Sequence, residues 1–298
     1  MRGSISYQVN YLWQQIDGIG ISKRKMRKES DIKGMNGHKI SPLVHAFRTK
    51  DEFKRIGKEL GNFAKSNFNV KDMQAINADI VFAYIIQKID DGLAQKSLSS
   101  YISVLQKIRI TCAKLPSNSY AHKTLFSQED LKDLRTMIDK NTIKNVHKNR
   151  AYINPASFAS SLPEKSKIAF QLQLEYGVRA QEAILIRAFQ LRQKNKIEIQ
   201  GKGGYTRLIN IDKSLYNQIK KEIKRHGSYA RDYQVYLEDL KNAVEKKGEK
   251  WNGTHGLRFN FAQRKMQEYT ARFGHEKALE KVSFELGHHR KEITKYYL

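Results

Sequence analysis

The spacing of apolar residues changes halfway along this 298-residue chain, and that change limits the folds it can adopt. Between residues 41 and 115, apolar side chains recur every three or four positions, as at Phe53, Ile56, Leu60 and Phe63. This is the period of an amphipathic helix, and two further stripes follow it before residue 115. The pattern predicts a compact helical bundle over residues 41–115.

Residues 116–149 interrupt the pattern. The run Pro116-Ser117-Asn118-Ser119 ends the helical spacing, and a polar helix over about 127–147 leads to Asn154-Pro155. We therefore expect a domain boundary between 116 and 150, with residues 116–149 forming a linker that carries a helix.

Residues 150–298 combine the spacing of helices with the two-residue alternation of strands. A helix face ends at Gly177, and the segments 197–199 and 208–211 then alternate like strands. Between them lies Gly201-Lys202-Gly203-Gly204, which predicts a β-hairpin with Lys202 at its tip. The fold class expected for the chain is therefore mainly α, with a small antiparallel β-sheet in the second domain (α+β).

Helices should follow the hairpin. Asp212 is placed to cap a helix that ends at Gly227. A second stripe at helical spacing then runs up to Gly248, and we interpret it as core rather than as a surface on which bases stack. Its members are Tyr229, Tyr233, Tyr236, Leu240 and Val244.

Charge limits the class of partner. The chain has 55 Lys and Arg residues against 30 Asp and Glu residues, a formal net charge of +25. The excess is +5 over residues 1–40, +7 over 41–149 and +13 over 150–298. A spread of this kind indicates that several parts of the chain line one long polyanion, and duplex DNA is the first candidate. Charge by itself leaves RNA and ribosomal partners open.

In the first forty residues, a basic cluster is surrounded by Gly18, Gly20, Gly34 and Gly37, and this composition predicts an irregular N-terminal arm or appendage. Contact with DNA and a merely solvated run of charge are equally good interpretations of the cluster. Its basic residues are Lys23, Arg24, Lys25, Arg27 and Lys28.

Several classes of protein are excluded. The one cysteine, Cys112, leaves no intramolecular disulfide, Cys-rich zinc site or iron–sulfur cluster. The longest wholly apolar run, 80–86, has seven residues and is too short to span a membrane. We expect a cytoplasmic protein, associated with the nucleoid when bound to DNA.

Four short patterns carry residues suited to chemistry, and each is weak alone. They are Arg179-x-x-Glu182, Lys202 in its glycine-rich turn, His255-x-x-Arg258, and the C-terminal run from Glu285 to Leu298. The His-x-x-Arg spacing also occurs at 45–48 and 147–150, so that spacing does not identify a site.

Together and in this order, the four patterns resemble the catalytic domain of the tyrosine recombinases, the phage-integrase family. The resemblance covers about residues 150–298, and residues 41–115 are compatible with the helical core-binding domain of that family. It assigns catalytic roles to Arg179, Lys202, His255, Arg258, His288 and Tyr297, with Glu182 in support.

Two of these assignments require a choice. His288 completes Leu-Gly-His and has Thr294 at the family's offset, so it fits better than His289. Tyr297 lies nine residues after His288, which is the family's spacing, so it fits better than Tyr296.

The resemblance implies a site-specific recombinase or integrase of a mobile element that cleaves and rejoins DNA. Tyr297 would attack the phosphodiester and form a 3′-phosphotyrosine, His255 would assist removal of its proton, and Lys202 would protonate the departing 5′ oxygen. Arg179 and Arg258 would clamp the phosphate, and His288 would bond one of its oxygens. The resemblance further implies no metal and no cofactor, a homotetramer across two synapsed sites, and accessory DNA-bending proteins as candidate partners.

Other interpretations stay open. A resolvase or type IB topoisomerase would use the same residues, and a DNA-binding architectural or regulatory protein would lack catalysis. Only Leu298 follows Tyr297, whereas many family members continue with a segment that docks on the neighbouring subunit. Two explanations are open: the chain is truncated, or its subunits are coupled through other contacts.

Overall fold

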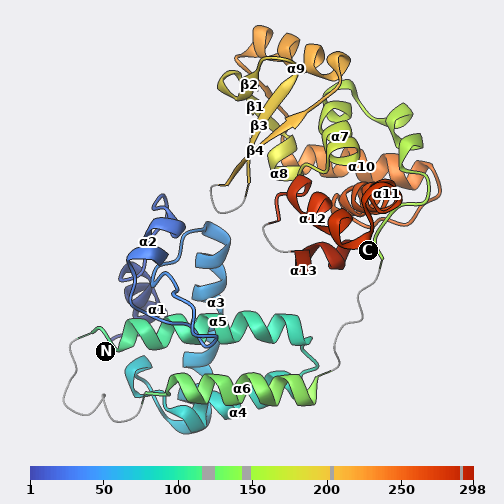
Figure 1. Cartoon of the computed structure of the whole chain (residues 1–298). Coiled ribbons are helices and arrows are strands. Elements are labelled where there is room, and N and C mark those ends of the chain that lie inside the picture. The colour runs from blue at the N-terminus through green and yellow to red at the C-terminus, as the bar shows by residue number, and fades with distance from the viewer. Residues whose placement is uncertain (116–124, 143–148, 202–204, 289–290) are drawn as a thin grey trace. The chain divides into compact units, whose positions relative to one another are not determined.

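The chain divides into two compact units, Met1–Val146 and His147–Leu298 (Figure 1). The division lies within the interval in which the sequence predicts a boundary. The computed structural model describes residues 1–115, 125–142, 149–201, 205–288 and 291–298.

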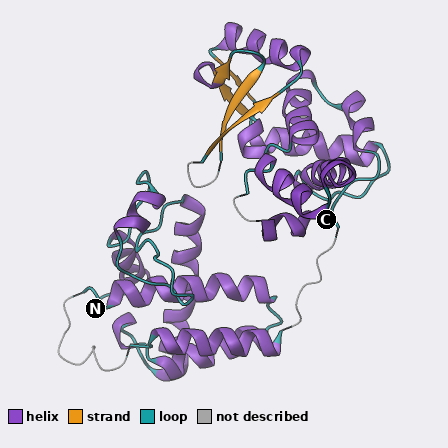
Figure 2. Ribbon diagram, in the orientation of Figure 1, coloured by secondary structure: helices purple, strands orange, loops and turns teal. Residues whose placement is uncertain are grey.

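The first unit is helical in the part that the structure describes (Figure 2). Its elements are α1 (Ile5–Gln14), α2 (Lys23–Glu29), α3 (Phe47–Phe68), the 3-10 turn η1 (Met73–Ala75), α4 (Ala78–Asp90), α5 (Gln95–Cys112) and α6 (Gln128–Asn141). The bundle predicted for residues 41–115 is thus confirmed as α3, α4 and α5. One apolar core holds side chains from these three helices and also from α1 and α6.

Helix α1 crosses α3 where α3 carries two glycines about one turn apart. A Cβ atom on Gly57 would lie 3.1 Å from Val9, and one on Gly61 would lie 2.5 Å from Ile5. Larger residues at these positions would force the helices apart, so the glycines allow the close approach. Val9 and Leu12 of α1 are consequently fully buried, at 0% exposure.

Two expectations about this unit are wrong. Residues 1–40 are not an irregular arm, because α1 is part of the core and the Ser4 hydroxyl caps its first turn. Residues 116–149 are not only a linker, because α6 contributes Leu131, Leu134 and Ile138 to the same core. The basic cluster lies on α2, a helix with no buried residue.

The second unit combines helices with two small antiparallel sheets, drawn as arrows in Figure 2. Its elements are η3 (Pro155–Ser161), α7 (Glu164–Tyr176), α8 (Ala180–Ala183), β1 (Leu185–Arg187), η4 (Ala188–Gln190), β2 (Leu191–Arg192), β3 (Lys196–Gln200), β4 (Thr206–Asn210), α9 (Lys213–His226), β5 (Ser228–Ala230), α10 (Tyr233–Lys246), α11 (His255–Phe273), α12 (His275–Glu285), α13 (Lys291–Thr294) and η5 (Lys295–Tyr297). Strands β2, β3 and β4 form one sheet, and β1 pairs with β5 in the other.

Most of the local predictions for this unit are confirmed. Strands β3 and β4 form the predicted hairpin, with Ile197 opposite Ile209. The Asp212 carboxylate accepts a bond from the Leu215 amide at 2.9 Å, and α9 ends at Gly227 in the left-handed region, at φ +78°. The prediction that Tyr229 belongs to the following helix is wrong, because it lies on β5; it is nevertheless fully buried.

A third apolar cluster joins α11, α12 and η5. The start of α11 is held by the segment before η3. The Tyr152 hydroxyl donates to the Gly253 carbonyl at 3.0 Å, and the Asn260 side chain bonds both the amide and the carbonyl of Tyr152. These contacts set the direction in which the first turns of α11 project their side chains.

Within the described ranges, no helix combines the length and the apolar character that crossing a membrane requires.

The burial of α1 predicts a stability effect. We expect Leu12→Ala to lower the free energy of unfolding of the first unit by about 2–5 kcal/mol, because it leaves a cavity where a leucine is fully buried. Urea titrations followed by circular dichroism measure the change. Tyr7→Ala on the same helix, at 62% exposure, is the control and should cost under about 0.5 kcal/mol. Equal effects of the two variants would place α1 outside the core.

Candidate active site

Arg179 and Glu182 lie at the start of α8, directly after the turn that ends α7. Gly177 adopts φ +62° and ends α7, so the chain reverses and Arg179 becomes the residue that precedes α8. The Glu182 carboxylate accepts one bond from the Arg179 amide at 3.2 Å and another from its guanidinium at 2.8 Å. The predicted pairing of these two residues is therefore present, and the Arg179 side chain keeps 27% exposure.

A residue that sequence reasoning missed, Arg207, completes this group. Arg207 on β4 donates to the second carboxylate oxygen of Glu182 at 2.9 Å, and both side chains are under a tenth exposed. Burial by itself raises the pKa of Glu182, but the charges of Arg207 and Arg179 and their hydrogen bonds outweigh it and hold the pKa below its usual value. Glu182 is thus ionised at neutral pH and holds two arginines.

Strand alternation could have identified Arg207. Successive residues of a strand point to opposite faces, and Ile209 and Ile211, at and just after the end of β4, are buried. Arg207 lies two residues before Ile209, so it is on the same core-facing side of β4. A charged residue on a core-facing position needs a buried partner of opposite charge, and Glu182 meets that need.

Arg258 lies on the first turn of α11 and is fully buried, at 0% exposure. Its guanidinium donates to the Gly177 carbonyl and, at 3.1 Å, to the Leu286 carbonyl. Burial lowers the pKa of Arg258 to about 10, an effect that Tyr297 partly offsets, so the side chain remains a cation at neutral pH. The guanidinium thereby joins the end of α7, the start of α11 and the end of α12.

His288 follows α12 and lies beside Arg258. Its Nε2 atom is 3.4 Å from the Arg258 guanidinium, and its Nδ1 atom is 3.4 Å from the Thr294 hydroxyl. Burial, then the positive charges of Arg258 and Arg179, lowers the pKa of His288 to about 3, so the ring is neutral. These contacts agree with the choice of His288 and Thr294 as a pair; His289 lies outside the described residues.

Tyr297 occupies the centre of this group. Its hydroxyl lies 2.8 Å from Nε2 of His255, the first residue of α11. Its ring centroid lies 5.3 Å from that of His288 and 4.9 Å from that of Phe259, and the Arg258 guanidinium carbon is 5.6 Å from it. Tyr297 is only 4% exposed. Tyr296 instead packs its ring edge-on against Tyr297 and Phe259.

The structure therefore brings together five of the six predicted catalytic residues and Glu182. Lys202 lies outside the described residues, although the hairpin that carries it is confirmed. The basic residues of α2 belong to the other unit. In the described ranges, no group of three or more His, Cys, Asp or Glu side chains could hold a metal ion.

The arrangement has a definite chemical capacity. A phenol is a weak nucleophile at neutral pH, and a neutral imidazole within hydrogen-bond distance can take its proton. Fixed guanidinium groups stabilise the negative charge that develops when an oxyanion is attacked. The site thus suits attack by a tyrosine on an anionic ester.

Comparison with known proteins finds similarity in structure. No protein-family model matches the chain. No curated protein matches it either. Among solved structures, 31 chains match. The XerH site-specific recombinase bound to difH substrate in a pre-cleavage complex is 15% identical, with a TM-score of 0.59 over 99% of this chain and 90% of that one.

Two further solved structures extend the likeness. A lambda integrase dimer bound to a COC′ core site is 14% identical, with a TM-score of 0.55 over 85% of this chain and 72% of that one. The Tn1549 transposon integrase in complex with transposon right end DNA is 12% identical, with a TM-score of 0.54 over 99% and 95%. At these identities the likeness establishes the fold. The expected fold class is confirmed, and the chain shares the fold of these recombinase and integrase structures.

The environment of His288 predicts its titration. We expect its ring protons, observed by NMR and assigned with His288→Gln, to report a neutral imidazole from about pH 8 to about pH 5, where an ordinary histidine gains its proton. The unfolded chain protonates this residue near the ordinary pKa of about 6.5. Stability should therefore fall as the pH drops below that value, and less so in His288→Gln. A midpoint near 6.5 in the folded protein would contradict the buried, cation-flanked position.

Proposed function

We propose that this protein is a tyrosine recombinase that cleaves and rejoins DNA strands through a covalent phosphotyrosine at Tyr297. The observation that carries the proposal is the 2.8 Å contact between the Tyr297 hydroxyl and His255 Nε2, in a site that also holds Arg258 and His288. The solved structures with this fold support the chemical class, since they are a site-specific recombinase bound to its substrate, a lambda integrase bound to a core site and a transposon integrase in complex with transposon DNA.

In the proposed reaction, the Tyr297 oxygen attacks the phosphorus of a DNA phosphodiester and displaces the 5′ oxygen. A bond forms from phosphorus to the tyrosine oxygen while the bond to the 5′ oxygen breaks, leaving a 3′-phosphotyrosine and a free 5′ hydroxyl. His255 receives the phenolic proton, and Lys202 gives a proton to the departing oxygen. Attack by a 5′ hydroxyl reverses these steps and rejoins a strand.

The arginines have separate positions in this proposal. Arg179 is the more accessible, at 27% side-chain exposure, and would reach the non-bridging oxygens first. Arg258 is fully buried beside the Tyr297 ring, so a phosphate reaches it only when the ring shifts. Together with Lys202 they supply the positive charge that divalent metals supply in other phosphoryl-transfer enzymes.

The partners are part of the proposal. Double-stranded DNA is the substrate, bound by the first unit and by the catalytic second unit, and the exposed basic face of α2 is a candidate contact. A homotetramer across two synapsed sites, accessory DNA-bending proteins and a role in a mobile element follow from the resemblance to the family.

Trapping of the covalent intermediate tests the reaction. We expect a nicked suicide duplex, which loses the attacking 5′ end after cleavage, to accumulate a protein–DNA adduct that survives denaturation. Tyr297→Phe should abolish the adduct, since the ring then lacks the attacking oxygen.

Tyr296→Phe is the matched control, because it removes one hydroxyl from the neighbouring ring and should leave the adduct at the parental level. Loss of the adduct in Tyr296→Phe alone would make Tyr296 the nucleophile. The absence of any adduct with the parent protein on a duplex that it binds would favour a DNA-binding protein without catalysis. Rejoining without a second specific site would favour a topoisomerase.

Dependence on added ions gives a separate prediction. Because the phosphotyrosine conserves the energy of the broken ester and arginines provide the charge, the adduct should form at the same rate with excess EDTA and without ATP. A rate that falls by more than about tenfold in EDTA and returns with a divalent cation would show that the side chains do not suffice.

A further inference from the structure

We infer that Arg207 is a positioning residue that holds Arg179, His288 and the base of the hairpin that carries Lys202 in one arrangement. The inference rests on the proposed function of this site. Arg207 is 7% exposed at its side chain, so it acts through its neighbours rather than on the substrate.

The first contact of Arg207 determines where Arg179 lies. Each oxygen of the Glu182 carboxylate bonds one arginine, at 2.8 Å for Arg179 and 2.9 Å for Arg207. Glu182 is itself 8% exposed, so water cannot readily replace a lost partner. Without Arg207, the Glu182 carboxylate keeps only its bonds from the Arg179 amide, at 3.2 Å, and guanidinium, at 2.8 Å, so both the carboxylate and the Arg179 guanidinium are held less firmly.

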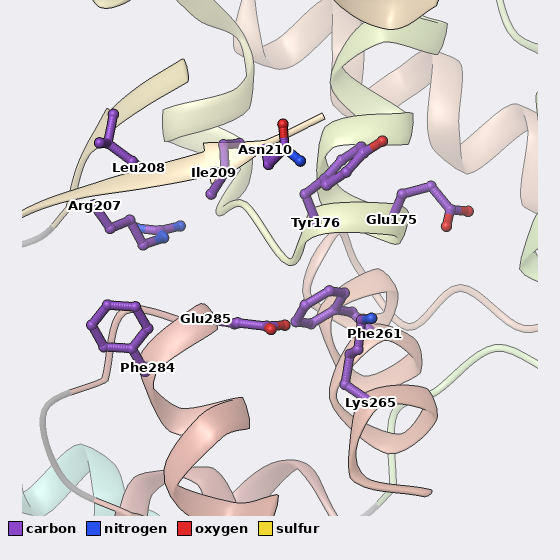
Figure 3. A pocket seen from close by; sticks show the side chains of 10 residues that line it. All are labelled: Glu175, Tyr176, Arg207, Leu208, Ile209, Asn210, Phe261, Lys265, Phe284 and Glu285. Atoms are coloured by element: carbon purple, nitrogen blue, oxygen red, sulfur yellow. The ribbon is translucent and has the colours of Figure 1, made fainter. Parts of the chain in front are cut away.

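The second contact is with the turn that precedes His288. Gly287 adopts φ +66°, and a Cβ atom there would lie 2.9 Å from Nη1 of Arg207. The guanidinium therefore fills the space that a side chain would need and packs on the backbone next to His288. Figure 3 shows Arg207 lying between the ribbon of β4 and the end of α12 that carries Phe284 and Glu285.

The third contact is with the base of the β3–β4 loop. A Cβ atom on Gly201 would lie 3.5 Å from Arg207 Nη1 and 3.5 Å from Glu182 Oε1. Gly201 also donates to the Tyr205 carbonyl at 2.6 Å, which closes the hairpin at the same place. One guanidinium thus lies beside three chain segments, each of which carries a residue of the proposed reaction.

Variants of Arg207 and a matched control test the inference. Arg207→Gln removes the charge, and Arg207→Lys keeps it without the planar fork that reaches both Glu182 and Gly287. Arg192→Gln is the control, because Arg192 pairs with Glu198 at 2.7 Å in the same sheet but is 43% exposed. Thermal unfolding and DNA affinity are measured for every variant.

The kinetic measurement is the rate of covalent adduct formation in a single turnover. We expect Arg207→Gln to lower it about 10- to 100-fold, Arg207→Lys to lower it less, and Arg192→Gln to leave it unchanged. The duplex is then made with a neutral methylphosphonate at the scissile position, which reduces the need for an arginine clamp. Because one of the three contacts of Arg207 acts through Arg179, the Arg207→Gln loss should shrink on this substrate, and it should be smaller in an Arg179→Ala background than in the parent.

Equal losses on the charged and neutral substrates would overturn the inference, and so would a full additional loss in the Arg179→Ala background. Both results would mean that Arg207 contributes only to general stability.

A measurement without DNA separates this inference from the proposed function. The Glu182 side-chain carboxyl, observed by carbon-13 NMR and assigned with Glu182→Gln, should titrate at a higher pH in Arg207→Gln than in the parent and in Arg192→Gln. The reason is that burial of the carboxylate remains while its second cation is lost. An unchanged titration would overturn the inference even if the parent protein forms no adduct.

Discussion

A buried positive charge, the Arg258 guanidinium, is the constraint on which the second unit depends. A desolvated cation is costly unless it finds hydrogen-bond partners, and two nitrogens of Arg258 bond the carbonyls of Gly177 and Leu286, while its buried Nε has no hydrogen-bond partner among the described residues. Both carbonyls belong to helix ends, where backbone acceptors lack partners within the helix. The end of α7, the start of α11 and the end of α12 must therefore meet at one point. The same meeting places His288 beside Arg258 and leaves room for the Tyr297 ring above it.

The features that could be predicted from sequence are those determined within a few residues. Arg179 and Glu182 are three positions apart, the hairpin has its glycine-rich turn, and α9 has both of its caps. The order of the four weak patterns was needed to select His255 and Arg258 from three His-x-x-Arg segments. The nine-residue spacing from His288 selected Tyr297 over Tyr296, and the hydrogen bond of Tyr297 with His255 agrees with the selection.

The features that could not be predicted depend on partners far along the chain. Strand alternation marks Arg207 as a charge on a core-facing position, but its partner Glu182 is 25 residues away and no local pattern joins the two. The glycines and charges of residues 1–40 suggested an arm. Helix α1 is nevertheless part of the core, because Gly57 and Gly61 of α3 lack side chains and let α1 pack closely against α3. Tyr229 kept helical spacing with the residues after it, yet pairing with Ile186 of β1 places it in a strand. In each case tertiary contacts outweigh local preference.

Because Tyr297 is buried over Arg258, binding of an anion at Arg258 and movement of the Tyr297 ring are coupled. In the proposed reaction a phosphate that reaches the guanidinium displaces the ring beside it, so binding of the phosphate and exposure of the Tyr297 hydroxyl are linked events. Linked equilibria are reciprocal. A contact that holds the terminal turn η5 in place therefore lowers the affinity for the anion, and binding of the anion weakens that contact by the same factor. In the proposed reaction, the packing of one aromatic ring thus makes the exposure of the nucleophile depend on whether the phosphate is bound.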